Sequence, residues 1–325
     1  MVSQTARLDS RGLAVPTATP AEADETTRSS PFHPGELALQ EATGATREAA
    51  RLGRFIETQI DPKASAFIGG QQVAIVATLD ASGRLVCSAL VGEPGAFEVV
   101  DPITLSIATC SGIVGDAVSE RTGDGAPIGL LFLEVATLRR YRVNGTVMGA
   151  HEGRILVRVA EAYPNCPKYI QRRALDLADD RAVFGDVRGG VHLDDAQRDL
   201  IASADTFFIA SAGPDRNLDA SHRGGRPGFV RIEGDRLWIP DYAGNNMYNT
   251  LGNLSLNPAT SLLFIDFDTG DTLQLSGVAD VDLEAVDAAT GGTNRAWTVT
   301  TTSWTRSRLA ARLRGELLEM SPHNP

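Results

Sequence analysis

The stretch Leu130-Leu131-Phe132-Leu133-Glu134 is matched later in the chain by Leu262-Leu263-Phe264-Ile265-Asp266. The match continues with Arg142-Val143-Asn144-Gly145 against Gln274-Leu275-Ser276-Gly277, at the same offset of 132 residues. Two such runs at one offset indicate a β-rich unit that is used twice in one chain. The repeat predicts a built-in dimer, with a ligand site where the two units meet.

A second match lies upstream of each run. Ser88 with Pro94-Gly95 lines up with Ser221 and Pro227-Gly228, at an offset of 133 residues. Apolar and β-branched runs predict strands at 73–78, 84–90, 103–108, 129–134, 140–147 and 154–160, and again at 206–210, 236–239, 261–267 and 272–278. A turn at residues 80–83 joins the first two strands as a hairpin. Strands at this spacing favour a barrel or sandwich over a βαβ sheet.

Helical patterns are expected outside these strands. Apolar residues recur at spacings of three and four over residues 35–60, and Asp61-Pro62 is expected to end that helix. Residues 165–205 predict a polar helical connection with Asp194 as an N-cap, and residues 306–318 predict a basic, helix-like tail. The predicted division is a disordered tail (1–30), a first β unit with an N-terminal helix (31–175), and a second with a C-terminal helix (176–325).

Charge and cysteine content limit the kinds of partner. The 325-residue chain carries a net charge of −11, so it repels phosphate backbones and nucleic acid is not expected to bind. The first thirty residues hold no apolar run long enough for a signal peptide or membrane span, and no membrane partner is expected. Three cysteines without metal-ligand spacing favour a reduced cytoplasm. His33 and His151 lack acidic or cysteine partners at ligand spacing, so no metal site is expected.

Several strings carry a more specific signal through their joint order: Phe32-His33-Pro34-Gly35-Glu36, Arg139-Arg140-Tyr141-Arg142-Val143-Asn144-Gly145, Asn165-Cys166-Pro167-Lys168-Tyr169-Ile170-Gln171, Ser221-His222-Arg223 with Pro227-Gly228, Asn245-Asn246-Met247-Tyr248-Asn249-Thr250-Leu251, and Asn257-Pro258. In this order they resemble the pyridoxamine 5′-phosphate oxidase-like family of FMN-binding split barrels, over residues 32–281.

The resemblance implies a mainly β (α+β) fold, with two tandem split β-barrels that form a fused pseudo-dimer with flanking helices. FMN is expected in the groove between the barrels. The implied activity is that of an FMN-dependent oxidoreductase: hydride transfer through the flavin to or from a small organic substrate, with NAD(P)H or oxygen as redox partner. The alternative is a split barrel that binds flavin or haem without catalysis. The protein is expected to be a monomeric pseudo-dimer or a homodimer, and no catalytic residue is assigned.

The family's phosphate site maps onto the second unit, at Ser221, His222, Arg223, Asn246, Asn249 and Thr250. The oxidase that names the family has Arg and Lys where Asn249 and Thr250 stand, which leaves Arg223 as the main expected charge. The same offsets place Leu90, Val114, Ala117 and Val118 at the first-unit positions of Arg223, Asn246, Asn249 and Thr250. We therefore expect one FMN per chain.

Each of the remaining candidates has two interpretations. In the family the partner barrel completes the site, and residues 165–171 are placed for that role. Lys168 and Gln171 share a face if that segment is helical, and they either touch the flavin or belong to a helix cap. Gln274 either reaches the edge of the flavin ring or pairs with a neighbouring strand residue. Cys166 is a reactive thiol near the flavin or, the preferred interpretation, a small buried hydrophobe.

Overall fold

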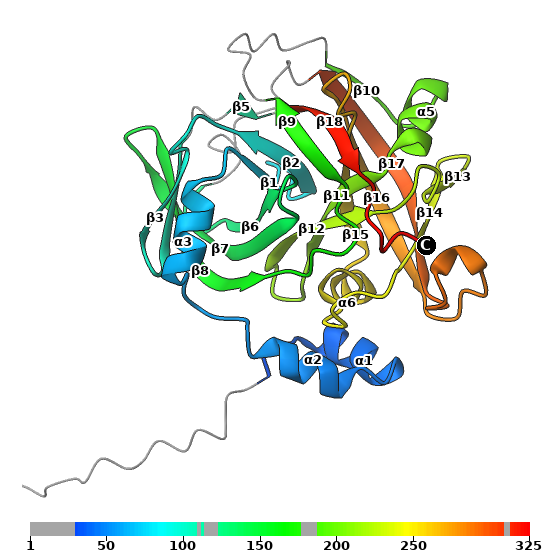
Figure 1. The fold of residues 1–325 in the computed structure, drawn as a ribbon, viewed down its shortest axis with the longest axis horizontal. Helices are drawn as coiled ribbons and strands as arrows, with labels where there is room; N and C mark the ends of the chain where they lie inside the picture. The colour runs from blue at the N-terminus through cyan, green and yellow to red at the C-terminus, as the bar shows by residue number, and fades with distance from the viewer. Residues whose placement is uncertain (1–29, 109–111, 114–122, 177–186, 309–312) are drawn as a thin grey trace, which may run out of the picture. The chain divides into compact units, whose positions relative to one another are not determined.

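Antiparallel strands form two large sheets in the computed structural model, which describes residues 30–108, 112–113, 123–176, 187–308 and 313–325 (Figure 1). The residues from Phe32 to Pro325 form one compact unit. The predicted tail at residues 1–29 lies outside the described residues, and the predicted division at residue 175 stays a prediction.

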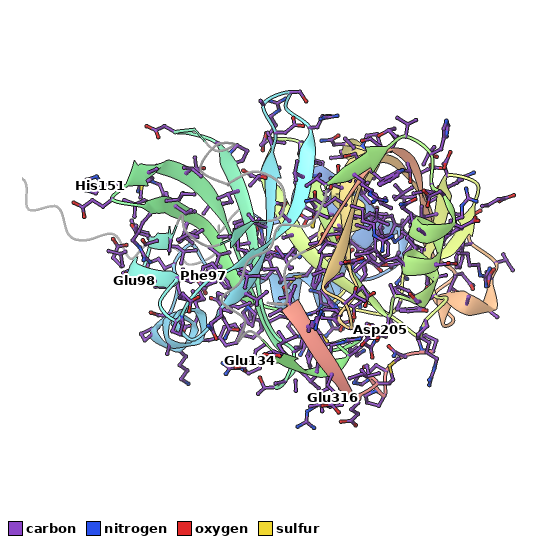
Figure 2. The ribbon with its side chains drawn as sticks, turned by 90° about the horizontal axis from the view of Figure 1, so that it is seen from above. Phe97, Glu98, Glu134, His151, Asp205 and Glu316 are labelled. Atoms are coloured by element: carbon purple, nitrogen blue, oxygen red, sulfur yellow. The ribbon has the colours of Figure 1, made fainter. Side chains whose placement is uncertain are left out.

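The first sheet is built from residues before 165. Its strands follow the order β3-β4-β8-β7-β6-β1-β2-β5. They are β1 (Val73–Leu79), β2 (Leu85–Val91), β3 (Phe97–Asp101), β4 (Thr104–Ala108), β5 (Gly112–Ile113), β6 (Pro127–Glu134), β7 (Arg139–His151) and β8 (Arg154–Pro164). Phe97 lies inside this barrel, whereas the exposed His151 ends β7 at its edge (Figure 2).

The second sheet repeats the arrangement. Its path is β12-β11-β15-β16-β17-β14-β13, with β10 paired to β17. Its strands are β10 (Arg188–Gly190), β11 (Thr206–Ala212), β12 (Leu218–Gly224), β13 (Arg231–Glu233), β14 (Arg236–Pro240), β15 (Ala259–Ile265), β16 (Asp271–Asp282) and β17 (Ala296–Arg308). A separate pair, β9 (Arg172–Asp176) and β18 (Arg314–Glu319), joins the end of the first half to the end of the chain. The predicted fold, a mainly β protein with two β units, is confirmed.

The strand registers establish the duplication residue by residue. The inner strand of each sheet pairs on both sides in the same way: Ala74 with Leu90 and Phe132, and Phe207 with Arg223 and Phe264. Both copies also have a β-bulge at the same repeat position, between Asn144 and Gly145 and between Ser276 and Gly277. A Cβ atom at Gly145 would lie 2.1 Å from the Arg158 carbonyl oxygen, so the bulge has no room for a side chain.

The repeated leucine-phenylalanine run is buried on both faces of its strand. In β6, Leu130 and Phe132 point into the core of the first barrel, while Leu131 and Leu133 belong to a cluster shared between the two sheets. In β15, Leu263 enters the same shared cluster. Because successive strand residues face opposite sides, a run without polar residues fits a strand that lies between two cores. This explains why the run survives in both copies.

Six helical segments complete the described chain: α1 (Pro34–Ala42), α2 (Thr46–Gly53), α3 (Pro62–Gly69), α5 (Asp195–Ser203), α6 (Asn249–Leu256) and the short 3₁₀ helix η1 (Ala288–Thr290). The N-terminal helix expected at 35–60 is two helices, and Asp61-Pro62 begins α3 instead of ending the earlier helix, since Asp61 accepts hydrogen bonds from the first turn of α3. Asp194 caps α5 as predicted.

Two predicted helical segments are wrong. Within residues 165–205 only α5 is helical among the described residues, and β9 and β10 occupy part of the remainder. The basic tail at 306–318 consists, where described, of the end of β17 and most of β18. Arg306, which falls in the predicted helix-like tail, is a strand residue with a partner and lies 2.8 Å from Asp271. No described helix combines the length and the apolar character that crossing a membrane requires.

Candidate functional site

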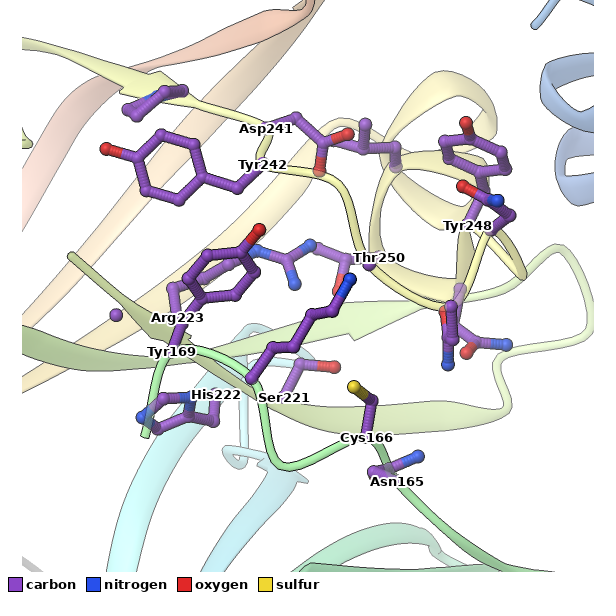
Figure 3. Close-up of a pocket in the computed structure, with 18 of the residues that line it drawn as sticks. Asn165, Cys166, Tyr169, Ser221, His222, Arg223, Asp241, Tyr242, Tyr248 and Thr250 are labelled. Atoms are coloured by element: carbon purple, nitrogen blue, oxygen red, sulfur yellow. The ribbon is translucent and has the colours of Figure 1, made fainter. Parts of the chain in front are cut away.

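A pocket opens where the second barrel meets the end of the first (Figure 3). Its floor is β12, one wall is the start of α6 with the loop before it, and the other wall is the segment after β8 together with β7. The two halves of the chain thus both contribute to it. The charged residues in its lining are Arg140, Arg142, Lys168, Arg223, Arg295 and Asp241. Cationic groups therefore dominate this pocket, although the whole chain is acidic.

Arg142 crosses from the first barrel to the second. Its side chain, on β7, is buried, and its guanidinium donates to the Tyr163 hydroxyl at 2.8 Å and to the Ser221 hydroxyl. Asp219 lies 3.2 Å away as the counter-charge. Burial disfavours the cation, but Tyr163 and Asp219 together raise the pKa of Arg142 above its ordinary value. Arg142 is therefore a fixed positive charge at the junction.

His222 is neutral, and its tautomer follows from its neighbour. Its Nδ1 lies 3.1 Å from Nη1 of Arg140, whose own Nε donates to the Cys166 carbonyl oxygen at 2.6 Å. Because a guanidinium can only donate, Nδ1 must accept and the proton sits on Nε2. Burial and the charges of Arg140 and Arg223 lower the pKa of His222 well below 6.5. Burial, with a smaller contribution from Arg223, likewise lowers the pKa of Arg140 to about 10.

Three buried nitrogen donors at this site lack a hydrogen-bond partner among the described residues: Arg142 Nε, His222 Nε2 and Arg223 Nε. Burial also lowers the pKa of Arg223, with Asp241 opposing the shift. A buried donor without an acceptor costs about 1–3 kcal/mol. Donors left in this condition around one pocket fit an anionic ligand that would accept from them.

The start of α6 adds backbone donors to the pocket. Tyr248, the residue before the helix, has φ of 63°, and no side chain caps the first turn. Asn249, Thr250 and Leu251 of that turn line the pocket. The free N–H groups of a helix start, with the positive end of its dipole, favour an anion.

Glu36 holds this helix start from the other side. Its Oε1 accepts from the Asn249 side chain at 2.5 Å, and its Oε2 accepts from the backbone N–H of His33 at 2.9 Å. The side chain is buried, and burial is the main cause that raises the pKa of Glu36 to about 8. His33 in turn bonds to Asn253 of α6 at 2.8 Å, so the Phe-His-Pro-Gly-Glu string anchors α6.

Comparison with known proteins identifies a family resemblance in the second half of the chain. Residues 193–301 match the family model described as pyridoxamine 5′-phosphate oxidase. This match supports the resemblance that the sequence predicted. No curated protein matches the chain.

Solved structures also resemble parts of the chain. An F420 reductase is 15% identical over 34% of this chain and 98% of its own, with a TM-score of 0.28. A putative pyridoxamine 5′-phosphate oxidase from Lactobacillus delbrueckii is 13% identical over 35% and 93%, with a TM-score of 0.29. HutZ, a haem storage protein from Vibrio cholerae, is 12% identical over 34% and 89%, with a TM-score of 0.26. TM-scores this low carry no weight for function.

Seven of the nine residues predicted from the oxidase-like family line the pocket: Lys168, Ser221, His222, Arg223, Asn246, Asn249 and Thr250. Their contact with FMN stays a prediction. Cys166 also lines the pocket and is half-buried, so the preferred interpretation of a small buried hydrophobe is wrong. Of the two cysteines that the structure describes, Cys87 is the fully buried one, and burial raises the pKa of its thiol.

Gln171 and Gln274 lie outside the pocket lining. Gln171 is buried and ties together several chain segments, with its Oε1 accepting from the Ser321 backbone N–H at 2.7 Å and its Nε2 facing the carbonyl oxygen of Gly225 at 3.2 Å. Gln274 donates to the Cys87 carbonyl oxygen at 2.8 Å and to the Ser88 hydroxyl at 2.9 Å. It therefore spans the two barrels at a different place.

The duplication explains where Gln274 lies. Gln274 pairs with Leu263 in the second sheet as Arg142 pairs with Leu131 in the first. Arg142 reaches Ser221 of the opposite barrel, and Gln274 reaches the matching Ser88. The two are pseudo-symmetric mates, so each belongs to the site beside the other barrel. Sequence reasoning missed Arg142. It could have been found by taking the residue 132 positions before Gln274 and assigning it to the site beside the second barrel.

In the first unit, the predicted phosphate-site residues (the cradle) keep the serine as Ser88 but lose the main cation. Leu90 replaces Arg223 and is buried in the first core. The offsets also put Thr272 and Gln274 in place of Arg140 and Arg142. Val114, Ala117 and Val118 lie outside the described residues.

Proposed function

We propose that this protein is an FMN-dependent oxidoreductase that transfers hydride to or from a small organic substrate, with NAD(P)H or oxygen as the other redox partner. When bound, FMN would supply the hydride chemistry, and the protein would supply binding and orientation. The observation that carries the proposal is the group of unpartnered buried donors beside the uncapped start of α6.

The phosphate is assigned to this group. Arg223 supplies charge from β12, Arg142 supplies charge from the first barrel, and the first turn of α6 supplies N–H donors at Asn249 and Thr250. Charge-assisted hydrogen bonds of this kind are about twice as strong as neutral ones. They also compensate for the Arg and Lys of the family oxidase that Asn249 and Thr250 replace.

Aromatic side chains at the pocket rim suit a flat ring system. Tyr169 and Tyr242 have ring centres 5.2 Å apart, and the Tyr169 hydroxyl donates to the Ala243 carbonyl oxygen at 2.9 Å. Both residues line the pocket, and Tyr169 comes from the segment that follows the first barrel. We assign the flavin ring to this side and the phosphate to the side of Arg223.

One FMN per chain follows from the loss of charge in the other copy. The pseudo-symmetric position has Leu90 for Arg223 and Gln274 for Arg142, so it lacks both cations that hold the phosphate in the proposed site. Free thiols at Cys87 and Cys166 support a reducing cytoplasm as the proposed compartment.

The test is spectroscopic. Purified protein titrated with FMN should show flavin absorbance and saturate at one equivalent per chain, and the absorbance should bleach when NADPH or NADH is added. Bound flavin that no nicotinamide reduces, and that turns over no substrate under oxygen, would favour the non-catalytic binding alternative. Absence of flavin binding would refute the proposal.

Replacing Arg223 with leucine, the residue of the first copy, tests the phosphate assignment. Loss of a charge-assisted bond of about 1.5–3 kcal/mol should weaken FMN binding by about tenfold to a hundredfold in fluorescence titration. Arg226→Leu is the matched control, because the exposed Arg226 lies three residues away and outside the pocket lining. Unchanged FMN affinity in Arg223→Leu would overturn the assignment.

A further inference from the structure

A groove runs along helix α2 and adjoins the flavin pocket. Asn246, Tyr248 and Arg295 line both cavities, so the two lie side by side. The remaining groove residues come from α2, the turn before it and its C-cap: Thr43, Gly44, Ala45, Arg47, Glu48, Ala50, Arg51 and Arg54. Nothing in the proposed FMN site uses these residues.

Three arginines face this groove from the α2 segment. Arg47, Arg51 and Arg54 follow one another at spacings of four and three, which places them on one side of the helix. All three are exposed, and no hydrogen bond or ion pair joins their guanidinium groups to another described residue. Like charges at this spacing destabilise a helix. In a chain of net charge −11, such a cluster of arginines favours the binding of an anionic ligand.

Arg295 connects this row to the pocket. Its Nε lies 2.9 Å from Asp241, and its guanidinium carbon lies 5.3 Å from the centre of the Tyr248 ring. The side chain is 13% exposed, so its position is fixed by packing. Arg295 is therefore a held cation at the opening between the two cavities.

The backbone at this opening is strained. Asn246 and Tyr248 have φ of 58° and 63°, in the left-handed region that disfavours residues with a side chain. Such residues cluster at ligand sites, where neighbouring contacts hold them in place. Here the Asn246 side chain donates to Glu48 of α2 at 2.8 Å, which fixes the loop against the helix. Glu48 is the one acidic residue among those that line the groove, and it is engaged in that bond.

We propose that the groove binds the ADP portion of a dinucleotide whose flavin or nicotinamide end lies in the pocket. This inference rests on the proposed flavin site. The single phosphate of FMN is already satisfied by Arg223, Arg142 and α6, so a further row of arginines calls for further phosphate. Guanidinium groups bind the paired oxygens of a diphosphate in a bidentate manner. The ADP could belong to FAD as cofactor or to NAD(P)H as electron donor, and binding measurements distinguish the two.

The test compares wild-type protein with the variant R47Q/R51Q/R54Q by calorimetric titration of ADP, both with and without FMN loaded. ADP binding should weaken at least about tenfold, while FMN affinity stays within about twofold, because the arginines lie outside the FMN cradle. The control R158Q/R188Q/R314Q removes the same charge from three exposed positions on β8, β10 and β18.

Two further arms identify the source of the ADP. If it is FAD, wild-type protein binds FAD more tightly than FMN and the variant loses that preference. If it is NAD(P)H, FAD shows no preference, and NADPH or NADH binds the FMN-loaded variant about tenfold more weakly than the wild type. ADP affinity that is absent, equal in wild type and variant, or equally reduced in the control would overturn the inference. Failure of FMN itself to bind would instead refute the proposed flavin site.

Discussion

At the residue scale, the buried polar side chains around α6 decide which groups remain available to a ligand. Asp219 accepts from Asn144 at 2.7 Å and from Asn253 at 2.9 Å, and it also neutralises Arg142. Because the Asp219 carboxylate is fully engaged by these groups, it holds Arg142 in position. The Nε of Arg142 has no hydrogen-bond partner among the described residues. In the proposed site, the position of Arg142 thus depends on Asp219, which is not itself in the pocket lining.

Glu36 predicts a pH dependence of stability. Its pKa is about 8 in the folded protein and about 4.5 when exposed, so its contribution to stability is complete below pH 4.5 and is lost as the pH rises to 8. The wild type should therefore lose up to about 1.4 kcal/mol of unfolding free energy per pH unit relative to Glu36→Gln across that window. Urea unfolding at pH 5 to 9 measures the difference.

The matched control is Glu41→Gln, on the exposed side of the same helix. If the difference in unfolding free energy between Glu36→Gln and the wild type stays constant from pH 5 to pH 9, Glu36 is ionised in the folded state.

At the element scale, the repeated strands are specified by apolar runs and by two glycine bulges. Apolar runs located most of the long strands, because a strand between two cores is apolar on both faces, but they did not locate β12 or β17. Sequence patterns also failed at residues 306–318, where partners from distant strands neutralise arginines that a local pattern assigns to a solvated helix. Arg306 is one example, paired with Asp271 across the sheet. Such pairing is a property of the sheet, and no local window contains it.

The bulge in the second barrel predicts intolerance of a methyl group. At Gly277 a Cβ would lie 2.5 Å from Val299 Cγ1 and 2.7 Å from the Thr300 carbonyl oxygen. Gly277→Ala should therefore destabilise the protein by about 1–3 kcal/mol, because the strands must separate to admit it. Gly69→Ala is the control, since its new methyl group would meet nothing closer than 4.0 Å and helix α3 favours alanine. Equal urea midpoints for the two variants would contradict this account.

At the scale of the whole molecule, the two barrels share a core. Leu131 and Cys87 of the first sheet pack with Phe208 and Leu263 of the second in one buried cluster. A shared cluster couples the stability of the barrels, so they should unfold together rather than one at a time.

The tryptophans allow this coupling to be measured. Trp238, Trp297 and Trp304 all belong to strands of the second sheet, so their fluorescence reports on the second barrel. Leu131→Ala, made in the first barrel, should lower the fluorescence-detected unfolding free energy by about 2–5 kcal/mol through the cavity it leaves in the shared cluster. The exposed Val100 provides the control substitution, Val100→Ala. A tryptophan transition that does not move in Leu131→Ala would show that the barrels unfold independently.

The sequence by itself determined the duplication, most strands, the family resemblance and the placement of Arg223, Asn249 and Thr250 around one pocket, because each of these follows from a local pattern or a constant offset. Only the tertiary structure decided which residues cross from one barrel to the other. It put Arg142 beside Ser221 and sent Gln274 to Ser88, and it placed Gln171 in a buried network away from the pocket. The physical reason is the pseudo-twofold relation of the barrels. Matching residues of the two copies, such as Arg142 and Gln274, each reach across to the other barrel. Only the packing of the two sheets shows which site each side chain reaches.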